Sequence, residues 1–594
     1  MSRFIVITVV LALLACPLLR GSAGAISVVG SLHDLRKYDS SGTEGRVCIF
    51  CHTPHHATLL QDTQYTGPLW NRDENNVLVN PNYYTSYASS TIVASQGKAV
   101  GQPQGASRLC LSCHDGTIAL ASANTHGIGI TIPPITGTGL LGTNLSADHP
   151  VSIEYGLKPG EYVDAATVTG TTRVKLPKRG GVSYVECTSC HDPHDNQYSN
   201  FMVVNTAAQN DALCTICHAP INWTGSTHQA TPGLLAKGCT SCHVPHKAQR
   251  PENLLILGGA GGIDSNCTAS CHNGTNGLSI GSFTHGNNSD NPPGDKHKGA
   301  ENEAITVSWG ADTLPVSKDS KHVHCVDCHN PHQAMTSPAT PPTPPDVNGV
   351  LKGVRGVDIG GHPRIGSSPY AQYEYEVCFR CHSGTDAESG YFNNAVMPMV
   401  RIFNSWNEQA RFNPASAISW HPVAAPFARV GDSMGLSLRD PSMTTVYCND
   451  CHDPHGSARP HLLRKDSPDG FAIGLNPYND LCYTCHNDIY LINSGSNVSK
   501  LHKAHVLGSH VPANNYQVSC SACHDPHGVP QKPGTTSNNA VHLINFDSRF
   551  ADPATTVYDA TAGSCFIGTV TGLTQQCHAS GTTRFISDYA TLSP

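Results

Sequence analysis

The cysteines and histidines of this sequence recur together in one short pattern. Cys-x-x-Cys-His occurs ten times in the 594 residues. Two thiols three positions apart on one helical turn can form thioethers to both vinyl groups of a haem, and the adjacent His then points its imidazole at the iron. Each copy therefore predicts one covalently attached haem c. The ten motifs are Cys48/Cys51/His52, Cys110/Cys113/His114, Cys187/Cys190/His191, Cys214/Cys217/His218, Cys239/Cys242/His243, Cys325/Cys328/His329, Cys378/Cys381/His382, Cys448/Cys451/His452, Cys482/Cys485/His486 and Cys520/Cys523/His524.

Two further cysteine pairs end in the same way but have longer interiors. Three residues separate Cys267 from Cys271, which His272 follows, and eleven separate Cys565 from Cys577, which His578 follows. The cost of closing a loop grows slowly with its length, so both inserts can loop out. We expect both pairs to bind haem, for twelve in all; a disulfide or a lost haem is the alternative at each.

Zinc knuckles and redox dithiols also use paired cysteines. Neither needs a His directly after every second cysteine, yet all twelve pairs here have one. The sequence therefore favours haem over zinc.

The sixth iron ligand is expected to be histidine. The chain has only 7 methionines but 34 histidines, and the twelve motifs leave 22 of these for other roles. Bis-His ligation lowers the reduction potential relative to Met/His ligation.

Six motifs continue as Cys-His-x-Pro-His. A residue three positions after the proximal His cannot reach the opposite face of the same iron, and the proline ends the helical turn. The second histidine is predicted to bind the iron of a neighbouring haem; a hydrogen bond to a propionate or a surface position is the alternative. These histidines are His55, His194, His246, His332, His455 and His527.

Histidines between the motifs are candidates for the remaining distal ligands. His285 is chosen from His285, His297, His322 and His324, and His505 from His502, His505 and His510. His362 is a further candidate, whereas His56, His126 and His461 are expected to contact solvent or propionates. The predicted set is His33, His149, His228, His285, His421, His505 and His542.

Motifs with the Pro-His extension alternate strictly with motifs that lack it. This internal repeat groups the twelve sites into six doublets. The predicted division is 1–25 signal peptide, then doublets at 26–150, 151–228, 229–300, 301–421, 422–510 and 511–594.

The N-terminus predicts export. Arg3, an apolar run from Phe4 to Leu14 and an Ala-Gly-Ala end at Ala25 are typical of a secretory signal. The alternative is a lipoprotein signal with a lipid on Cys16. The expected location is extracellular or at the outer cell surface, with the periplasm as the alternative.

Composition predicts a fold whose core is cofactor. Gly and Pro number 55 and 41, and charged residues are only 13% of the chain. We expect a mostly irregular chain with short α-helices at the motifs and a few small β-hairpins, such as one over Ala166–Leu176, where β-branched residues are frequent. The net charge of −8, to which propionates add, argues against nucleic acid and anionic membranes as partners.

The doublets and the phrases "CSACHDPHG", "HPV", "HLINFD" and "SLHDL" resemble the doubled-CXXCH multihaem cytochromes of bacteria that respire metals and other insoluble acceptors. That family includes periplasmic carriers, outer-membrane-associated cytochromes and subunits of extracellular filaments. The long inserts between the second and third motifs and between the eighth and ninth depart from its simplest pattern.

The resemblance implies long-range electron transfer through stacked bis-His haems to extracellular acceptors such as metal oxides, electrodes or other cytochromes, either as a polymer or as a single subunit. A discrete outer-membrane or porin-associated conduit is the alternative. A multihaem reductase of nitrite or a sulfur oxyanion is disfavoured, because such enzymes need an open iron position and all twelve motifs keep their His.

Overall fold

The structure is a computed structural model of the 594-residue chain. It describes residues 27–39, 45–55, 57, 69–71, 83–87, 100–117, 135–156, 161–206, 211–220, 222–230, 238–257, 264–269, 271–274, 279–280, 325–335, 342–365, 369–383, 407–425, 438–440, 442–457, 459–467, 471–473, 479–495, 502–503, 505–507, 516–530, 543–545, 556–559, 564–567 and 575–576.

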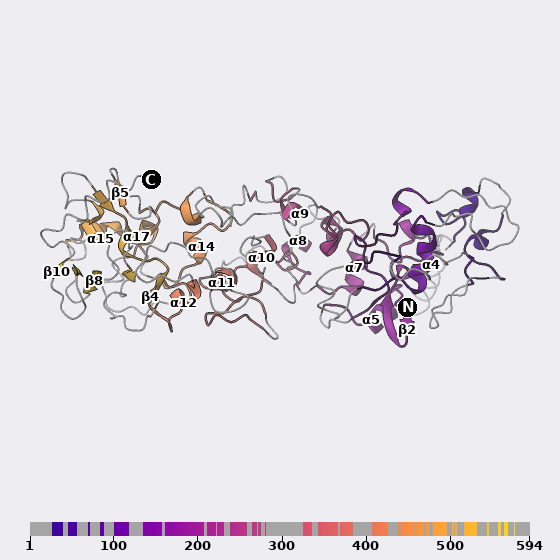
Figure 1. Ribbon diagram of the computed structural model, residues 1–594, viewed down its shortest axis with the longest axis horizontal. Coiled ribbons are helices and arrows are strands. Elements are labelled where there is room, and N and C mark those ends of the chain that lie inside the picture. Colours follow the sequence, from indigo (N-terminus) through magenta and orange to yellow (C-terminus); the bar gives the residue numbers. More distant parts are fainter. Residues whose placement is uncertain are drawn as a thin grey trace, which may run out of the picture. The chain divides into compact units, whose positions relative to one another are not determined.

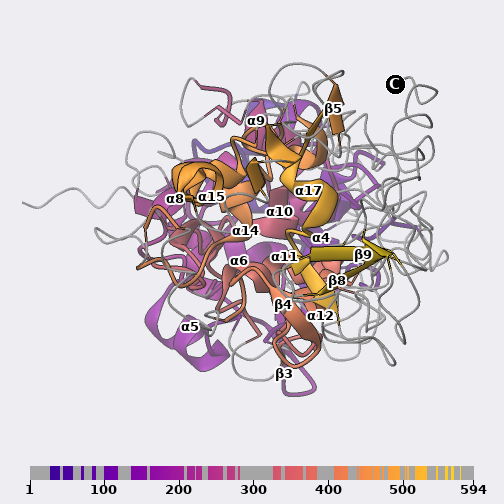
Figure 2. The ribbon, with the colours of Figure 1, turned by 90° about the vertical axis from the view of Figure 1, so that its left-hand side faces the viewer.

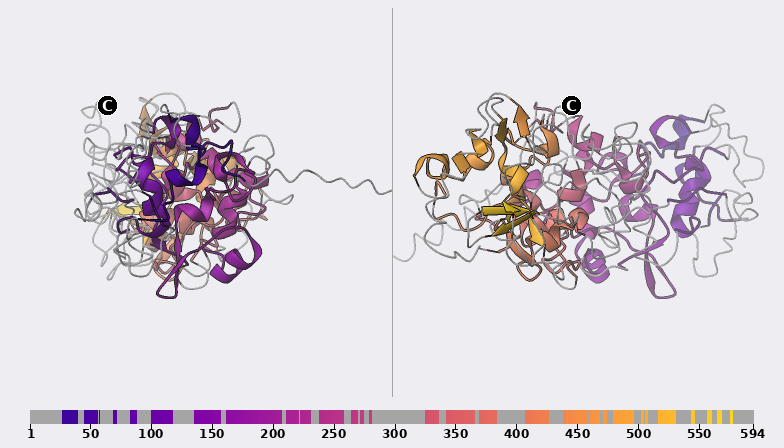
Figure 3. Two further views of the ribbon diagram at one scale, coloured as in Figure 1. Left: turned by 90° about the vertical axis from the view of Figure 1, so that its right-hand side faces the viewer. Right: turned by 60° about the vertical axis from the view of Figure 1, so that its left-hand side comes forward.

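The chain forms two compact units. The first comprises Met1–Ile221 and Leu235–Leu257, and the second comprises Asn222–Leu234 and Gly258–Pro594. In both, short helices are joined by long irregular segments (Figure 1), and the additional views of Figure 3 show the same pattern.

The first unit has one small sheet. Its described elements are η1 (Leu35–Lys37), η2 (Val47–Phe50), α4 (Gly105–His114), η3 (Gly137–Gly139), β1 (Ile153–Glu154), α5 (Ala165–Thr171), β2 (Lys178–Arg179), β3 (Val182–Val185), α6 (Cys187–Cys190), η4 (Ser199–Phe201), α7 (Ala212–Cys217), η5 (Gly238–Ser241) and η6 (Glu252–Leu254). The strand order is β1-β3-β2, antiparallel throughout. Gly180 and Gly181, both with positive φ, make the two-residue turn between β2 and β3, as such a tight hairpin requires.

The described residues of the second unit form three small antiparallel sheets. Its described elements are α8 (Thr227–Ala230), α9 (Ser265–Thr268), α10 (Cys325–Cys328), η9 (Gly349–Leu351), α11 (Glu374–His382), α12 (Glu408–Phe412), β4 (Ala417–Trp420), α14 (Cys448–Cys451), η10 (Pro460–Leu462), β5 (Phe471–Ile473), η11 (Cys482–Thr484), α15 (Asp488–Asn493), β6 (Tyr516–Val518), α17 (Cys520–Cys523), β7 (Gly528–Pro530), β8 (Thr556–Asp559), β9 (Ser564–Ile567) and β10 (Gln575–Gln576). The pairings are β4 with β7, β5 with β6, and β10-β9-β8. Figure 2 shows β8 and β9 side by side.

Apolar side chains gather in small separate clusters. One cluster in the first unit is built on Val168, Val174, Leu176 and Val203. The largest in the second unit brings α11 and α12 together through Tyr375, Phe379 and Phe412. Among the described residues, no helix has the length and hydropathy to cross a membrane.

The hairpin expected over Ala166–Leu176 is wrong, because α5 occupies most of that segment. The Asp164 side chain caps the helix by accepting a hydrogen bond from Ala166 N, and Val168 is buried. The hydroxyls of Thr169 and Thr171 bond to carbonyls four residues earlier, which accommodates threonine in a helix. Packing and capping therefore override β propensity here.

The prediction of a mostly irregular chain with short helices and few small strands is confirmed. The six two-haem modules and their boundaries stay a prediction. The chain passes from one unit to the other at 221/222, inside the predicted second doublet, and at 234/235 and 257/258, inside the predicted third.

Candidate haem sites

Each described Cys-x-x-Cys-His motif forms a single closed turn. The histidine N–H donates to the carbonyl of the first cysteine four residues earlier, at 2.9 Å from His52 to Cys48, 3.0 Å from His191 to Cys187 and 2.9 Å from His524 to Cys520. This turn places both sulfurs and the imidazole at one end of a short helix. The motif therefore adopts, from local bonds alone, the conformation that thioether attachment needs.

The motif with one extra residue closes in the same way. His272 N donates to Cys267 O at 2.9 Å, across five residues instead of four. The hydrogen bond that closes the regular motifs is thus also present in this longer one. The extra residue between Cys267 and Cys271 therefore leaves the closing hydrogen bond of this motif intact.

The eleven-residue insert is bounded by a β-hairpin. Strands β9 and β10 pair with Gln576 opposite Phe566 and Gln575 opposite Ile567. Cys565 directly precedes Phe566 on β9, and Cys577 directly follows Gln576. The hairpin backbone therefore returns the end of the insert to its start; Cys577 and His578 themselves lie outside the described residues.

Histidine rings from distant parts of the chain face each other at a narrow range of separations. Nine proximal histidines have such a partner among the described residues, with ring centroids 5.8–6.3 Å apart. The pairs are His33–His114, His52–His194, His149–His218, His191–His246, His228–His272, His329–His455, His421–His486, His452–His527 and His502–His524.

This spacing fits an iron between the two rings. Two imidazoles that bind one metal from opposite sides, with metal–nitrogen bonds of about 2 Å, have their centroids about 6 Å apart. Imidazoles in direct stacking contact lie closer, as His33 does to Phe201, at 4.3 Å. The nine histidine pairs lie close to this separation, at 5.8–6.3 Å.

Hydrogen bonds to carbonyls orient the proximal rings. Nδ1 of His114, His191 and His452 lies 2.7 Å from a backbone carbonyl oxygen, of Gly139, Asn200 and His461 respectively. A carbonyl only accepts, so Nδ1 carries the proton and Nε2 keeps the lone pair that binds a metal.

Four of the six Pro-His histidines face the proximal histidine of the motif two positions earlier in the chain. His194 belongs to the third motif and faces His52 of the first; His246 of the fifth faces His191 of the third. The ninth and eleventh motifs repeat this relationship through the pairs His455–His329 and His527–His452. The extension is therefore a link between alternate motifs.

Histidines between the motifs contact the carbonyl oxygen of the proline in a Cys-His-x-Pro-His motif. Nδ1 of His228 lies 2.8 Å from Pro331 O, and Nδ1 of His421 lies 2.5 Å from Pro526 O. His149 instead donates its backbone N–H to Pro245 O at 2.8 Å. The proline carbonyl of each of these motifs thus holds a histidine. The ring of that histidine faces the proximal imidazole of the motif before.

Sulfur contacts join the doublets. Cys110 and Cys187, the first cysteines of the second and third motifs, are hydrogen-bonded to each other. The same contact occurs four more times. In each case it joins the first cysteine of an even-numbered motif to the first cysteine of the odd-numbered motif that follows. These contacts are Cys214–Cys239, Cys267–Cys325, Cys378–Cys448 and Cys482–Cys520.

Contacts inside doublets complete the series. Burial raises the pKa of Cys190 to about 12, and the nearby Cys217 contributes to the rise. Burial likewise raises the pKa of Cys451 to about 12, with Asp450 and Cys482 contributing. In these two doublets, the second cysteine of the Pro-His motif thus lies near the motif that follows.

The first and seventh motifs also have their second cysteine near the motif that follows. Cys51 and Cys113, the second cysteines of the first doublet, both pack against the buried ring of Phe50. In the fourth doublet, burial raises the pKa of Cys328, and Cys381 of the following motif contributes to the rise. In four of the predicted doublets, cysteines of the two motifs therefore lie near one another.

Backbone hydrogen bonds also hold second cysteines in place. Cys242 N donates to Cys239 O at 3.2 Å, and Cys242 O accepts from Ile256 N at 2.9 Å. Cys51 O likewise accepts from Asn71 N at 2.9 Å. The side chains of Cys51, Cys113, Cys242 and Cys381 are half-buried rather than exposed. These four residues are thus held within closed motif turns, while the thioether bonds expected at their sulfurs stay a prediction.

Burial keeps the facing imidazoles neutral. It lowers the pKa of His149, His191 and His421, and it lowers that of His452 to about 4. An imidazole binds a metal only in its neutral form, so these rings are in the ligating state at neutral pH.

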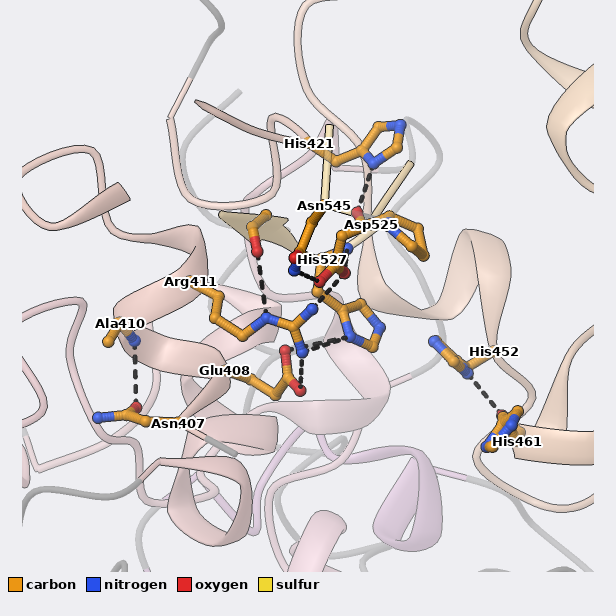
Figure 4. A network of polar contacts seen from close by, with 12 residues as sticks. Asn407, Glu408, Ala410, Arg411, His421, His452, His461, Asp525, His527 and Asn545 are labelled. Carbon is orange, nitrogen blue, oxygen red and sulfur yellow. Dashed lines mark hydrogen bonds and ion pairs between the residues drawn. The ribbon is translucent and has the colours of Figure 1, made fainter. Parts of the chain in front are cut away.

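A network of charged groups surrounds His527 (Figure 4). Its Nδ1 lies 3.1 Å from Glu408 Oε2 and 3.3 Å from Arg411 Nη1. Arg411 is itself buried and forms ion pairs with Glu408 and Asp525. Burial alone would raise the pKa of Glu408, but Arg411 and His527 lower it to about 2.

Other predicted residues have different surroundings. His55 is exposed, with no ring contact among the described residues, and His332 lies against Trp223 with centroids 6.0 Å apart. His362 is exposed beside Asp358. His502, not the expected His505, faces His524. Predicted site residues outside the described part of the chain are His285, His542, His578 and Cys577.

Two carboxylates near predicted distal histidines were missed by the sequence analysis. Asp148 lies 3.0 Å from Nδ1 of His246, and Glu408 lies beside His527. Asp148 directly precedes the predicted ligand His149, which is a signal that could have identified it. Glu408 lies in a helix with no motif nearby, so the sequence contains no such signal.

Comparison with known proteins finds a family model that matches two parts of the chain. Residues 180–222 and 441–489 match the family described as doubled CXXCH motif. No curated protein matches the chain. The two matched stretches include the motifs at Cys187, Cys214, Cys448 and Cys482. Their pattern indicates covalently bound c-type haem, and with the facing imidazoles it supports a multihaem c-type cytochrome that transfers electrons.

Proposed function

We propose that the chain is a dodecahaem c-type cytochrome that carries electrons over a long distance through bis-His haems to acceptors outside the cell. The nine imidazole pairs at iron-ligating spacing carry this proposal. An iron with two imidazoles has no open position for a substrate, but it still accepts and releases an electron.

The order of motif contacts supports a continuous path. Sulfur contacts such as Cys110–Cys187 join even motifs to the next odd motif, and contacts such as Cys190 with Cys217 act inside doublets. Cofactors attached to neighbouring cysteines are themselves neighbours. Electrons would therefore pass along the haems in the order of the motifs within each unit.

The position of His55 supports assembly of several copies. Each of four other Pro-His histidines faces the proximal histidine of the motif two positions earlier. His55 is exposed. A filament in which His55 binds an iron of a second copy would satisfy this series. A discrete outer-membrane or porin-associated conduit is the alternative.

A reductase is less well supported. Nitrite or a sulfur oxyanion would need an iron with one free position. Among the described residues, nine proximal histidines already face a second imidazole. The proposed partners are therefore other cytochromes and mineral or electrode surfaces, and the proposed location is extracellular or at the outer cell surface.

Electron cryo-microscopy of haem-staining material shed from cells, combined with electron paramagnetic resonance, tests the proposal. We expect low-spin ferric haems throughout and a filament whose haem chain is continuous across subunit boundaries. Discrete particles with only low-spin haems would favour the conduit. A high-spin haem that binds nitrite or sulfite would favour the reductase.

A further inference from the structure

Two facing histidines have a carboxylate oxygen within hydrogen-bond distance of Nδ1, whereas the carboxylate of Asp192 lies farther from Nδ1 of His194, at 3.8 Å. His246 Nδ1 lies 3.0 Å from Asp148 Oδ1, and His527 Nδ1 lies 3.1 Å from Glu408 Oε2. By contrast, His228 and His421 donate to neutral backbone carbonyls. The irons behind these rings would therefore have ligands of different basicity.

The backbone positions Asp148 against His246 from both sides. His149 N donates to Pro245 O at 2.8 Å, and Ala248 N donates to Ala147 O at 2.9 Å. Lys247 N also donates to Asp148 Oδ1 at 3.2 Å. Only 5% of Asp148 is exposed, so its carboxylate is held in place by the fold rather than by solvent.

We infer that Asp148 is a positioning residue that holds the proton on Nδ1 of His246 and lowers the reduction potential of the haem at Cys187/Cys190. This inference rests on the proposed bis-His ligation by His191 and His246. A carboxylate that accepts a hydrogen bond from Nδ1–H makes the imidazole a stronger donor to iron, which stabilises the ferric state.

Glu408 has the same contact with a weaker expected effect. Arg411 Nη1 forms an ion pair with Glu408 at 2.9 Å and also lies near the ring of His527. The guanidinium offsets part of the carboxylate charge at the imidazole. The described residues give Asp148 no ion pair other than that with His246. Removing the charge of Glu408 should therefore change the reduction potential of the haem at Cys448/Cys451 only a little. Removing the charge of Asp148 should change the potential of the haem at Cys187/Cys190 more.

Asp453 provides a matched control. Asp453 lies in a Cys-His-x-Pro-His motif, as His246 does. Its Oδ1 accepts a hydrogen bond from the backbone N–H of His455 at 3.1 Å and makes no described contact with the ring of that histidine. In the seventh motif the equivalent residue is already Asn330, whose Oδ1 accepts from His332 N at 3.0 Å. Asp453→Asn thus reproduces a natural neutral form.

The test is a potentiometric titration of the haem-loaded full chain, followed by electron paramagnetic resonance. Asp148→Asn should move one one-electron step to higher potential while all haems stay low-spin. Glu408→Gln should move a different step, by a smaller amount. Asp453→Asn should leave the titration curve unchanged. Asp148→Glu should restore the wild-type curve.

Two results would overturn the inference. Superimposable titrations of wild type and Asp148→Asn would remove the effect on potential, and a new high-spin haem in Asp148→Asn would mean that the carboxylate anchors the ligand instead. Failure of the ligation proposal looks different, because wild-type protein would then itself lack the bis-His low-spin signals.

Discussion

His329 and His455 face each other with ring centroids 5.9 Å apart, although they belong to different attachment motifs. His329 follows Cys328, whereas His455 is the second histidine of the motif that begins at Cys448. This relationship identifies which haem each second histidine would serve, and it makes the link between alternate motifs open to direct tests.

The first test replaces His455 by Ala. The haem at Cys325/Cys328 should become high-spin, because its iron loses the imidazole opposite His329, while the haem at Cys448/Cys451 stays attached and low-spin. Electron paramagnetic resonance and haem staining measure both results. His362→Ala is the control, since the ring of His362 is exposed. An unchanged low-spin spectrum in His455→Ala would exclude the link.

The second prediction concerns the stretched motif at Cys267. Its closing hydrogen bond from His272 to Cys267 matches those of the regular motifs, so it should bind haem. Replacing Cys267 and Cys271 by Ser should lower the intact mass by one haem beyond the change of side chains, and the pyridine haemochrome absorbance should fall in step. An intact mass without that loss would leave the disulfide or lost-haem alternative.

The third prediction concerns the buried cation in Figure 4. Arg411→Ala would leave the carboxylates of Glu408 and Asp525 buried without their partner, at a cost of about 3–5 kcal/mol. The control is Arg439→Ala, because the Arg439–Asp488 pair is half-exposed and such pairs contribute at most about 1 kcal/mol. Thermal unfolding of the two variants should therefore differ clearly; equal midpoints would contradict the assignment.

The fourth prediction is a pH dependence at Glu374. Burial raises the pKa of this carboxyl from 4.5 to about 7, and its Oε2 has no hydrogen-bond partner. Between these values the folded chain keeps a proton that the unfolded chain releases, so stability falls as pH rises from 4.5 to 7. Glu374→Gln should lose this slope. Denaturant midpoints across that range measure it, and parallel slopes would refute the prediction.

Local spacing predicted the attachment turns because every atom that shapes them lies within six consecutive residues. The bond from His191 to Cys187 and its counterparts follow from helical geometry, and the stretched motif keeps a hydrogen bond from His272 N to Cys267 O. The sequence also predicted a chain with little regular structure, since Gly and Pro are frequent and charged residues are few. The single candidates His149 and His421 each lie opposite a proximal imidazole.

The sequence by itself determined which residues can bind haem and which alternate along the chain, because these properties reside in short motifs. Only the tertiary structure decided which rings face each other, that His502 takes the place expected for His505, and that α5 is a helix. The contacts of Asp148 with His246 and of Glu408 with His527 likewise appear only after folding. The physical reason is that such pairs join residues far apart in sequence, and their geometry depends on backbone packing that no local pattern encodes.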